Sequence, residues 1–189
     1  MRSANALAQS DLGGRRIPDE LGGNPEVPGQ LGPVEACRVA DRSEIMTTQR
    51  AAVVREALTW LGTPWRHAAR VNGAGVDCGQ FLIGVFAGAG LVPAFETAEY
   101  PPDWHLHRSE ERYLSHVERF CGRIPGPPLP GDLVLYRWGR CLAHGAIVVD
   151  WPTIVHSYRD LGVSLDDGIG NSVLAARQAG FWSFWREGH

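Results

Sequence analysis

Cys78, His144 and His156 are residues whose types could together perform nucleophilic catalysis. A cysteine attacks a carbonyl carbon as a thiolate, and it needs a base that takes its proton and a third group that orients that base. Histidine suits the role of base because its unperturbed pKa lies near neutral pH. A single buried cysteine or histidine is more typical of ordinary packing. The combination favours a thiol nucleophile served by a histidine pair.

Cys78 stands at the predicted start of a buried helix. Asp77 is a good N-cap residue, and the apolar residues 81, 82, 85 and 86 recur at helical spacing directly after it. The glycines at 79, 84 and 88 indicate a helix that packs tightly against its neighbours. The unpaired amide groups and the dipole at a helix start favour a thiolate over a thiol, so we expect the pKa of Cys78 to be lowered.

The two histidines fall on consecutive predicted strands. His144 opens a strand over residues 143–149, and His156 lies on a strand over 153–158. If the turn at residues 150–152 makes a hairpin, positions whose numbers sum to about 301 face each other. His144 then lies opposite residue 157, within one or two places of His156, and side chains at that range reach each other.

The remaining elements place helices first and strands afterwards. The period predicts helices over 47–61 and 109–121, irregular stretches over 65–76 and 93–107, and a proline-rich break at 125–130. Further strands are expected at 132–138, 162–165 and 181–185, with a short helix at 172–178. Short turns predict antiparallel neighbours, so the fold class is α+β with a sheet of about five strands. The sequence at 166–168 is typical of a turn and not of a metal-binding loop.

Composition bounds the class of protein. The 189 residues are 44% hydrophobic and 21% charged, and the net charge of −3 gives no basic field for nucleic acid. The four cysteines show neither metal-ligand spacing nor a disulfide framework, so we expect no metal and no cofactor. No stretch is long enough to insert in a membrane and no signal peptide is recognisable, which predicts synthesis in the cytoplasm.

The first 44 residues differ from the rest. They are rich in glycine and proline and have no sustained hydrophobic period, so residues 1–44 are predicted to form a flexible extension and residues 45–189 the folded domain. Met46 precedes the first patterned helix, and we hypothesise that translation starts there.

Several motifs, in order, resemble the NlpC family of papain-like cysteine peptidases that cut peptide stems of bacterial cell walls. The sequence has a Gly-x-Pro-aromatic element at 62–65, Asp-Cys at 77–78 and Pro-Gly-Asp-aliphatic at 130–133. A histidine followed by an apolar strand comes at 144–149, and a polar residue twelve places after that histidine is His156. The resemblance covers residues 47–185. The segment at 100–104 and the helix after it resemble the branch of the family found in bacteriophage tails.

The resemblance implies a papain-like fold in which Cys78 is the nucleophile, His144 the base and His156 the residue that orients it. It also implies a role for Asp77 in binding a substrate amine, beside its role as N-cap. The family usually has serine then glycine after the cysteine, where this chain has Gly79 and Gln80, and a tyrosine where this chain has Trp65. The candidate substrate-binding positions are Trp65, Asp77, Gly79 and Gln80.

The function implied is a thiol hydrolase that cleaves an amide bond in peptidoglycan stem peptides, in association with phage tail proteins and acting at the cell wall. Two alternatives stay open. One is a tail or cell-wall binding component that has kept the fold and lost the chemistry. The other is an amidase or acyltransferase acting on a small amide or an ester.

Overall fold

The computed structural model describes residues 42–101 and 111–185, all of which belong to one compact unit. The predicted extension at 1–44 lies almost entirely outside the described residues, and so do residues 102–104 of the tail-like segment. The helices are α1 (Arg42–Thr59), α2 (Cys78–Gly88), α4 (Arg112–Glu118) and α5 (Ser172–Ala175). The strands are β1 (Arg70–Val71), β2 (Gly75–Val76), β3 (Gly122–Ile124), β4 (Leu133–Trp138), β5 (Cys141–Asp150), β6 (Thr153–Tyr158), β7 (Gly162–Asp167) and β8 (Gln178–Ser183).

The described residues form two sheets. β1 and β2 make a small hairpin just before Cys78, and the other strands make one six-stranded sheet in the order β3-β8-β4-β5-β6-β7. All strand pairs are antiparallel. The α+β prediction is confirmed, with more strands than the predicted five. The addition to the large sheet is β3, which lies at the sheet edge and spans three residues, too few to show an alternating pattern.

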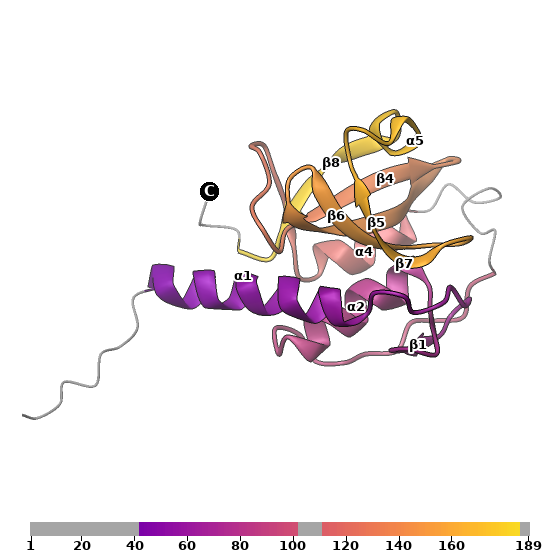
Figure 1. Ribbon diagram of the computed structural model, residues 1–189, viewed down its shortest axis with the longest axis horizontal. Coiled ribbons are helices and arrows are strands. Elements are labelled where there is room, and N and C mark those ends of the chain that lie inside the picture. Colours follow the sequence, from indigo (N-terminus) through magenta and orange to yellow (C-terminus); the bar gives the residue numbers. More distant parts are fainter. Residues whose placement is uncertain (1–41, 102–110, 186–189) are drawn as a thin grey trace, which may run out of the picture. The chain divides into compact units, whose positions relative to one another are not determined.

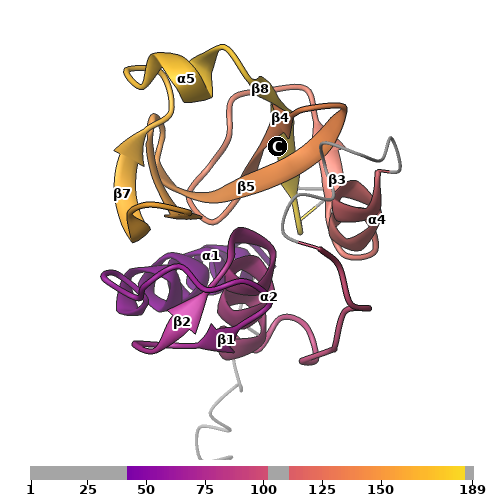
Figure 2. The same cartoon turned by 90° about the vertical axis from the view of Figure 1, so that its right-hand side faces the viewer.

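Helices cover the large sheet unequally. In Figures 1 and 2, α1 and α2 lie on one side of the sheet and the short α5 lies on the other. The larger buried cluster joins α1, α2 and the helix-facing side of the strands, and includes Val53, Phe81, Leu82, Val85, Leu133, Leu135, Ile147 and Val155. A smaller cluster on the α5 side contains Val134, Tyr136, Ala146, Val148, Ile154 and Leu174. The alternation of these two sets along β4 is what a strand buried on both faces requires.

The packing of α2 explains two of its glycines. A Cβ atom on Gly84 would lie 2.8 Å from the ring of Trp60, and one on Gly88 would lie 2.6 Å from the carboxylate of Glu56. Both partners belong to α1 or the turn after it; the rigid Trp60 ring makes glycine necessary at residue 84, whereas the flexible end of Glu56 could move away from residue 88. The predicted tight packing is confirmed at these positions.

A buried ion pair fixes α1 to the sheet. The Arg50 guanidinium lies 2.9 Å from the carboxylate of Asp132, and it also donates to the carbonyl oxygen of Pro130 at 3.0 Å. Asp132 is fully buried, so Arg50 supplies the charge that its carboxylate needs. The Pro-Gly-Asp motif at residues 130–132 therefore joins the first helix to the start of β4.

The Gly-x-Pro element at residues 62–64 is attached to the far edge of the sheet. The backbone N–H of Gly62 donates to the carbonyl oxygen of Val163 at 2.9 Å, and that of Val163 donates to Thr63 at 2.8 Å. Next to it, the Ser157 hydroxyl donates to the carbonyl oxygen of Val76 at 2.9 Å. These bonds hold the chain that leads into Cys78 against β6 and β7.

Candidate active site

Cys78 is the first residue of α2, and Asp77 caps the helix as predicted. One carboxylate oxygen of Asp77, Oδ1, accepts the backbone N–H of Gln80 at 2.9 Å. An aspartate in this position satisfies one of the unpaired amides of the first turn and fixes where the helix begins. The cap therefore sets the position of the cysteine.

The sulfur of Cys78 is in a site that favours the neutral thiol. Burial raises the pKa of Cys78 to about 12, and the negative charge of Asp77 adds to this effect. The backbone N–H groups of Cys78 and Gly79 act in the opposite direction, but more weakly. The expected lowering of the pKa is wrong, because desolvation and a neighbouring carboxylate outweigh the helix start. The thiol donates to the carbonyl oxygen of Ala143 at 3.5 Å.

A bulge in β5 brings Ala143 to the sulfur. Tyr136 on β4 pairs with His144, whereas the next residue, Arg137, pairs with Leu142. Ala143 is thus an extra residue on β5. Bulges of this kind kink a strand and redirect its groups, and they are frequent next to active sites.

His144 and His156 meet as the sequence predicts, although the register differs by one residue. Asp150 pairs with Thr153 at the turn, and the extra residue Val149 then gives the pairs Ile147–Val155 and Val148–Ile154, whose numbers sum to 302. A one-residue shift exchanges the faces of a strand. It places both histidines on the same face, where Nε2 of His144 lies 2.9 Å from Nδ1 of His156.

Both imidazoles are buried, with 7% of His144 and 1% of His156 exposed. Burial holds the pKa of His144 well below its usual value, and the neighbouring His156 lowers it further. His144 is therefore neutral near pH 7 and able to accept a proton. Because its Nε2 is engaged with His156, the nitrogen left for this task is Nδ1.

Cys78 and His144 line one cleft of about 460 Å³, with Trp65, Asp77, Trp138 and Tyr158 among its other walls. His156 stands behind His144, where a residue that orients the base belongs. Among the described residues the thiol bonds to Ala143 and not to His144. Cys78 and His144 thus line the same cleft, each with its pKa shifted toward the neutral form, and His156 is hydrogen-bonded to His144.

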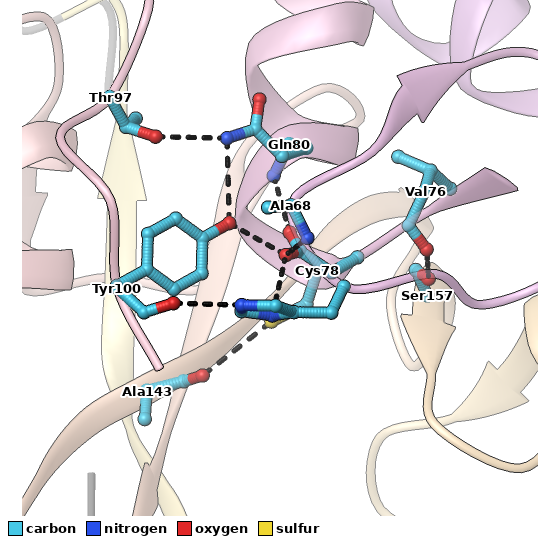
Figure 3. A network of polar contacts seen from close by, with 10 residues as sticks. Ala68, Val76, Cys78, Gln80, Thr97, Tyr100, Ala143 and Ser157 are labelled. Carbon is cyan, nitrogen blue, oxygen red and sulfur yellow. Dashed lines mark hydrogen bonds and ion pairs between the residues drawn. The ribbon is translucent and has the colours of Figure 1, made fainter. Parts of the chain in front are cut away.

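Asp77 is also the centre of a hydrogen-bond network, and Figure 3 labels its partners Ala68, Gln80 and Tyr100. Its Oδ2 atom accepts the backbone N–H of Ala68 at 2.8 Å and the hydroxyl of Tyr100 at 2.6 Å. His67 lies nearby, with Nδ1 3.8 Å from the same oxygen, and its Nε2 is 2.7 Å from the carbonyl oxygen of Tyr100. The carboxylate is 4% exposed and lines the cleft. It is thus a fixed negative charge at the edge of the site.

The other predicted substrate-binding positions behave differently from one another. Gln80 is buried, and its amide donates to Thr97 at 3.0 Å and to Tyr100 at 3.4 Å, so it holds the neighbouring segment. Gly79 has room for a side chain, because a Cβ there would lie 3.4 Å from the ring of Tyr113. Trp65 lines the cleft, with its ring centroid 6.3 Å from that of His67.

Tyr100 and Tyr113 are site residues that sequence reasoning missed. The Tyr100 hydroxyl bonds to Asp77, and burial together with that carboxylate raises the pKa of Tyr100, so it remains a donor. The Tyr113 hydroxyl donates to the carbonyl oxygen of Cys78 at 3.5 Å. Tyr113 falls in the helix predicted over residues 109–121, whose period indicates no contact with Cys78. Nothing in the local pattern at residue 100 indicates a contact with a carboxylate 23 residues earlier.

The described part of the chain contains neither a metal-ligand group nor a membrane-spanning helix. Within residues 42–101 and 111–185, no group of three or more histidine, cysteine or acidic side chains is arranged to hold a metal ion. Over the same ranges, no helix has both the length and the hydropathy for a bilayer crossing.

Comparison with solved structures gives the class of fold. One match is an NlpC/P60 family protein from Bacillus cereus, with 15% identity and a TM-score of 0.52 over 71% of this chain and 40% of that protein. Another is the peptidoglycan hydrolase RipB from Mycobacterium tuberculosis, with 18% identity and a TM-score of 0.50 over 80% of this chain and 71% of that one. No family model and no curated protein sequence matches the chain.

The chain therefore has the papain-like α+β fold of the NlpC/P60 proteins, as predicted. It spans less than half the length of the Bacillus cereus protein. At these identities the likeness to the solved structures shows the fold alone.

Proposed function

We propose that this protein is a cysteine peptidase of the NlpC/P60 family that hydrolyses an amide bond in peptidoglycan stem peptides. The observation that carries the proposal is the cleft that joins Cys78, at a capped helix start, to the hydrogen-bonded pair of His144 and His156. The peptidoglycan hydrolase RipB shares the fold, which supports the choice of substrate.

The reaction begins from neutral groups. When substrate places its carbonyl carbon at Cys78, Nδ1 of His144 takes the thiol proton as the sulfur forms a bond to that carbon. The N–H groups of Cys78 and Gly79 stabilise charge at this end of α2, and we assign them to the oxyanion of the tetrahedral intermediate. The imidazolium then gives its proton to the leaving nitrogen as the C–N bond breaks. Water then attacks the thioester carbon as His144 takes a proton from it. The C–S bond breaks, the proton returns to the sulfur, and the acid leaves.

Asp77 gives this site its preference for a free amine. Its carboxylate lies beside the nucleophile, is fixed by the backbone N–H groups of Ala68 and Gln80, and lines the cleft. A stem peptide that presents a free amino end places an ammonium where this charge is available. The Tyr100 hydroxyl donates to the same carboxylate and helps to hold it in place.

The direct test measures new amino groups and muropeptides released from purified peptidoglycan. Wild type should release both, and Cys78→Ala should release neither while keeping its thermal stability. Cys121→Ala is the matched control, because Cys121 lines the same cleft on its apolar side. Retention of full activity in Cys78→Ala would refute the assignment.

A binding component without catalysis is the second candidate. The raised pKa of Cys78 and the bond from its sulfur to Ala143 favour it. It predicts that wild type and Cys78→Ala bind peptidoglycan equally and leave muropeptides unchanged. The mass spectrum of the soluble products decides between the two, and it also identifies the bond cut or a product of ester or amide transfer.

Residues 100–104 support a further proposal, that the protein belongs to a phage tail and acts at the cell wall from there. Mass spectrometry of purified particles from cells that make this protein tests it. Peptides from residues 47–185 in the particle fraction are the expected result, and their confinement to the soluble cell extract would contradict it.

A further inference from the structure

The His144–His156 pair is followed by a buried polar cluster that the reaction above does not use. The atoms concerned are Nε2 of His156, the hydroxyl of Tyr136 and the hydroxyl of Ser164. All three are buried and have no hydrogen-bond partner among the described residues. Buried polar groups are nearly always paired, so a group of orphaned ones in one place requires an explanation.

The strand register shows why these atoms gather. His156 on β6 pairs with Ser164 on β7, and Ile154 pairs with Asp166, so Ser164 and Asp166 share the face of the two histidines. On the neighbouring strand β4, Tyr136 pairs with His144. Directly opposed residues point to the same face. The face therefore carries one row of polar side chains across four strands.

A carboxylate stands at the end of this row. Oδ2 of Asp166 lies 3.4 Å from Nε2 of His156. Its negative charge raises the pKa of His156 against the effect of burial, and it raises that of Tyr136. The other titratable groups with ring contacts to the pair are Tyr136 on β4 and Tyr158 on β6. Asp166 thus supplies the acidic group on this face.

Asp166 is held in place from two directions. Its Oδ1 accepts the backbone N–H of Asp167 at 2.8 Å, and its Oδ2 accepts the side-chain amide of Asn171 at 2.8 Å. Asn171 is itself the N-cap of α5, where its oxygen accepts two backbone N–H groups. A carboxylate fixed in this way is an oriented acceptor, and the turn at 166–168 gains a role beyond reversing the chain.

We infer that Asp166 is a positioning residue which fixes the tautomer of His156 and, through it, that of His144. The carboxylate lies 3.4 Å from Nε2 and favours the proton of neutral His156 on that nitrogen, although the two groups do not form a hydrogen bond in this geometry. Nδ1 of His156 then has only a lone pair, so Nε2 of His144 must donate to it across the 2.9 Å contact. This leaves Nδ1 of His144 without a proton, which is the state that the attack by Cys78 needs. No bond is made or broken at Asp166 itself.

The expected effect of Asp166 on catalysis rests on the proposed function, whereas its effect on the tautomers of His156 and His144 does not. Asp166→Asn keeps the shape and replaces the charge with an amide that can also donate, which favours the wrong tautomer. We expect kcat to fall by about tenfold to a hundredfold with KM unchanged, by analogy with partners that orient ligand histidines. Without the negative charge of Asp166 the protonated histidine pair is less stable and its pKa falls, so the acid limb of kcat/KM should move to lower pH. Asp167→Asn, next in sequence and on the other face, is the control and should change neither.

Nitrogen-15 NMR of the histidine side chains tests the tautomer without any need for activity. In wild type, His156 should be protonated at Nε2 and His144 at Nε2, with assignments from His144→Gln and His156→Gln. In Asp166→Asn the His156 signals should change toward the Nδ1-protonated form. Wild-type His156 protonated at Nδ1, or signals that are the same in Asp166→Asn and Asp167→Asn, would overturn the inference.

The two proposals fail in different ways. If wild type releases no muropeptide but His156 has the expected tautomer, the proposed function fails and the assignment of Asp166 stands. If wild type is active, Cys78→Ala is inactive and Asp166→Asn matches Asp167→Asn in both assays, only the inference about Asp166 fails. Should Asp166→Asn not fold, the wild-type spectrum alone decides whether the inference stands.

Discussion

The two sides of the cleft are built by different means. On the sheet side, His144, His156 and Asp166 come from three neighbouring strands, and backbone ladders set their relative positions. On the helix side, Asp77 and Gln80 form side-chain hydrogen bonds with Tyr100 and Thr97, which lie in a segment without regular structure. The two histidines and Asp166 are therefore placed by backbone register, whereas Asp77 and its partners are placed by side-chain contacts.

This difference explains how chemistry and recognition can change separately. A ladder of backbone bonds tolerates most side chains, so a base and its partner stay in register as the surface changes. A side-chain contact can be supplied from another position of the chain. Here the Tyr100 hydroxyl, from a segment without regular structure, donates to Asp77. Four predictions separate the two sides, from the largest effect to the smallest.

His144→Gln should lower kcat at least a thousandfold, because it removes the base that we place at Cys78. General base catalysis typically contributes about a hundredfold to ten-thousandfold. Release of amino groups from peptidoglycan at fixed enzyme concentration measures it. His116→Gln is the control in the same cleft, on α4, and should stay within about threefold of wild type. Equal losses in both variants would contradict the role of His144.

Tyr100→Phe should act on recognition and leave the chemical step nearly unchanged. It removes a hydrogen bond to a carboxylate, which is worth about 1.5–3 kcal/mol, or roughly tenfold or more in affinity. We expect KM for a stem peptide with a free amino end to rise by about that factor. The same peptide acetylated at its amino end gives the comparison. A matching loss for both peptides would show that Tyr100 does not act through the amine.

Gly145→Ala and Gly79→Ala should differ in stability, although both positions face Tyr113. A Cβ on Gly145 would lie 2.7 Å from the Tyr113 hydroxyl and 2.9 Å from Leu135, whereas one on Gly79 meets the Tyr113 ring at 3.4 Å. Overpacking costs about 1–3 kcal/mol, so Gly145→Ala should lower the free energy of unfolding by that amount. Gly79→Ala should change it by less than about 0.5 kcal/mol. Urea unfolding of both variants measures this, and equal values would mean that the sheet side is not the tighter one.

The smallest expected effect is that of mild acid on the reaction. The base acts when it is neutral, and the pKa of His144 lies well below 6.5, so kcat/KM is not limited by its protonation at or above that pH. From pH 7.5 to 6.5 we therefore expect a change of less than about twofold, with the loss coming at lower pH. A soluble stem peptide assayed across this range provides the measurement. An acid limb centred at or above pH 6.5 would contradict a buried, neutral His144.

How much of the fold and site could be predicted from the sequence depended on how local each feature is. The cap at Asp77 and the strand of His156 are local, and both were predicted with their bounds. The histidine pair was predicted from turn length, but the turn is centred one residue later than predicted and the extra residue Val149 moves the register again, and a bulge has no clear local pattern. The pKa of Cys78 was predicted in the wrong direction because burial is a property of the whole fold. The contacts of Tyr100 and Asp166 join distant segments and were missed for the same reason.

The central claim is that Cys78 is a neutral thiol which His144 activates only when substrate is bound. A chloromethyl ketone made from a stem peptide tests it most directly, with iodoacetamide as the general reagent and peptide mass mapping of all cysteines. We predict that the peptide reagent alkylates Cys78 at a rate that saturates with concentration and is lost in His144→Gln, while iodoacetamide reacts slowly below about pH 9, near the ordinary pKa of a thiol. Alkylation of Cys78 without saturation, or at the same rate in His144→Gln, would contradict the claim.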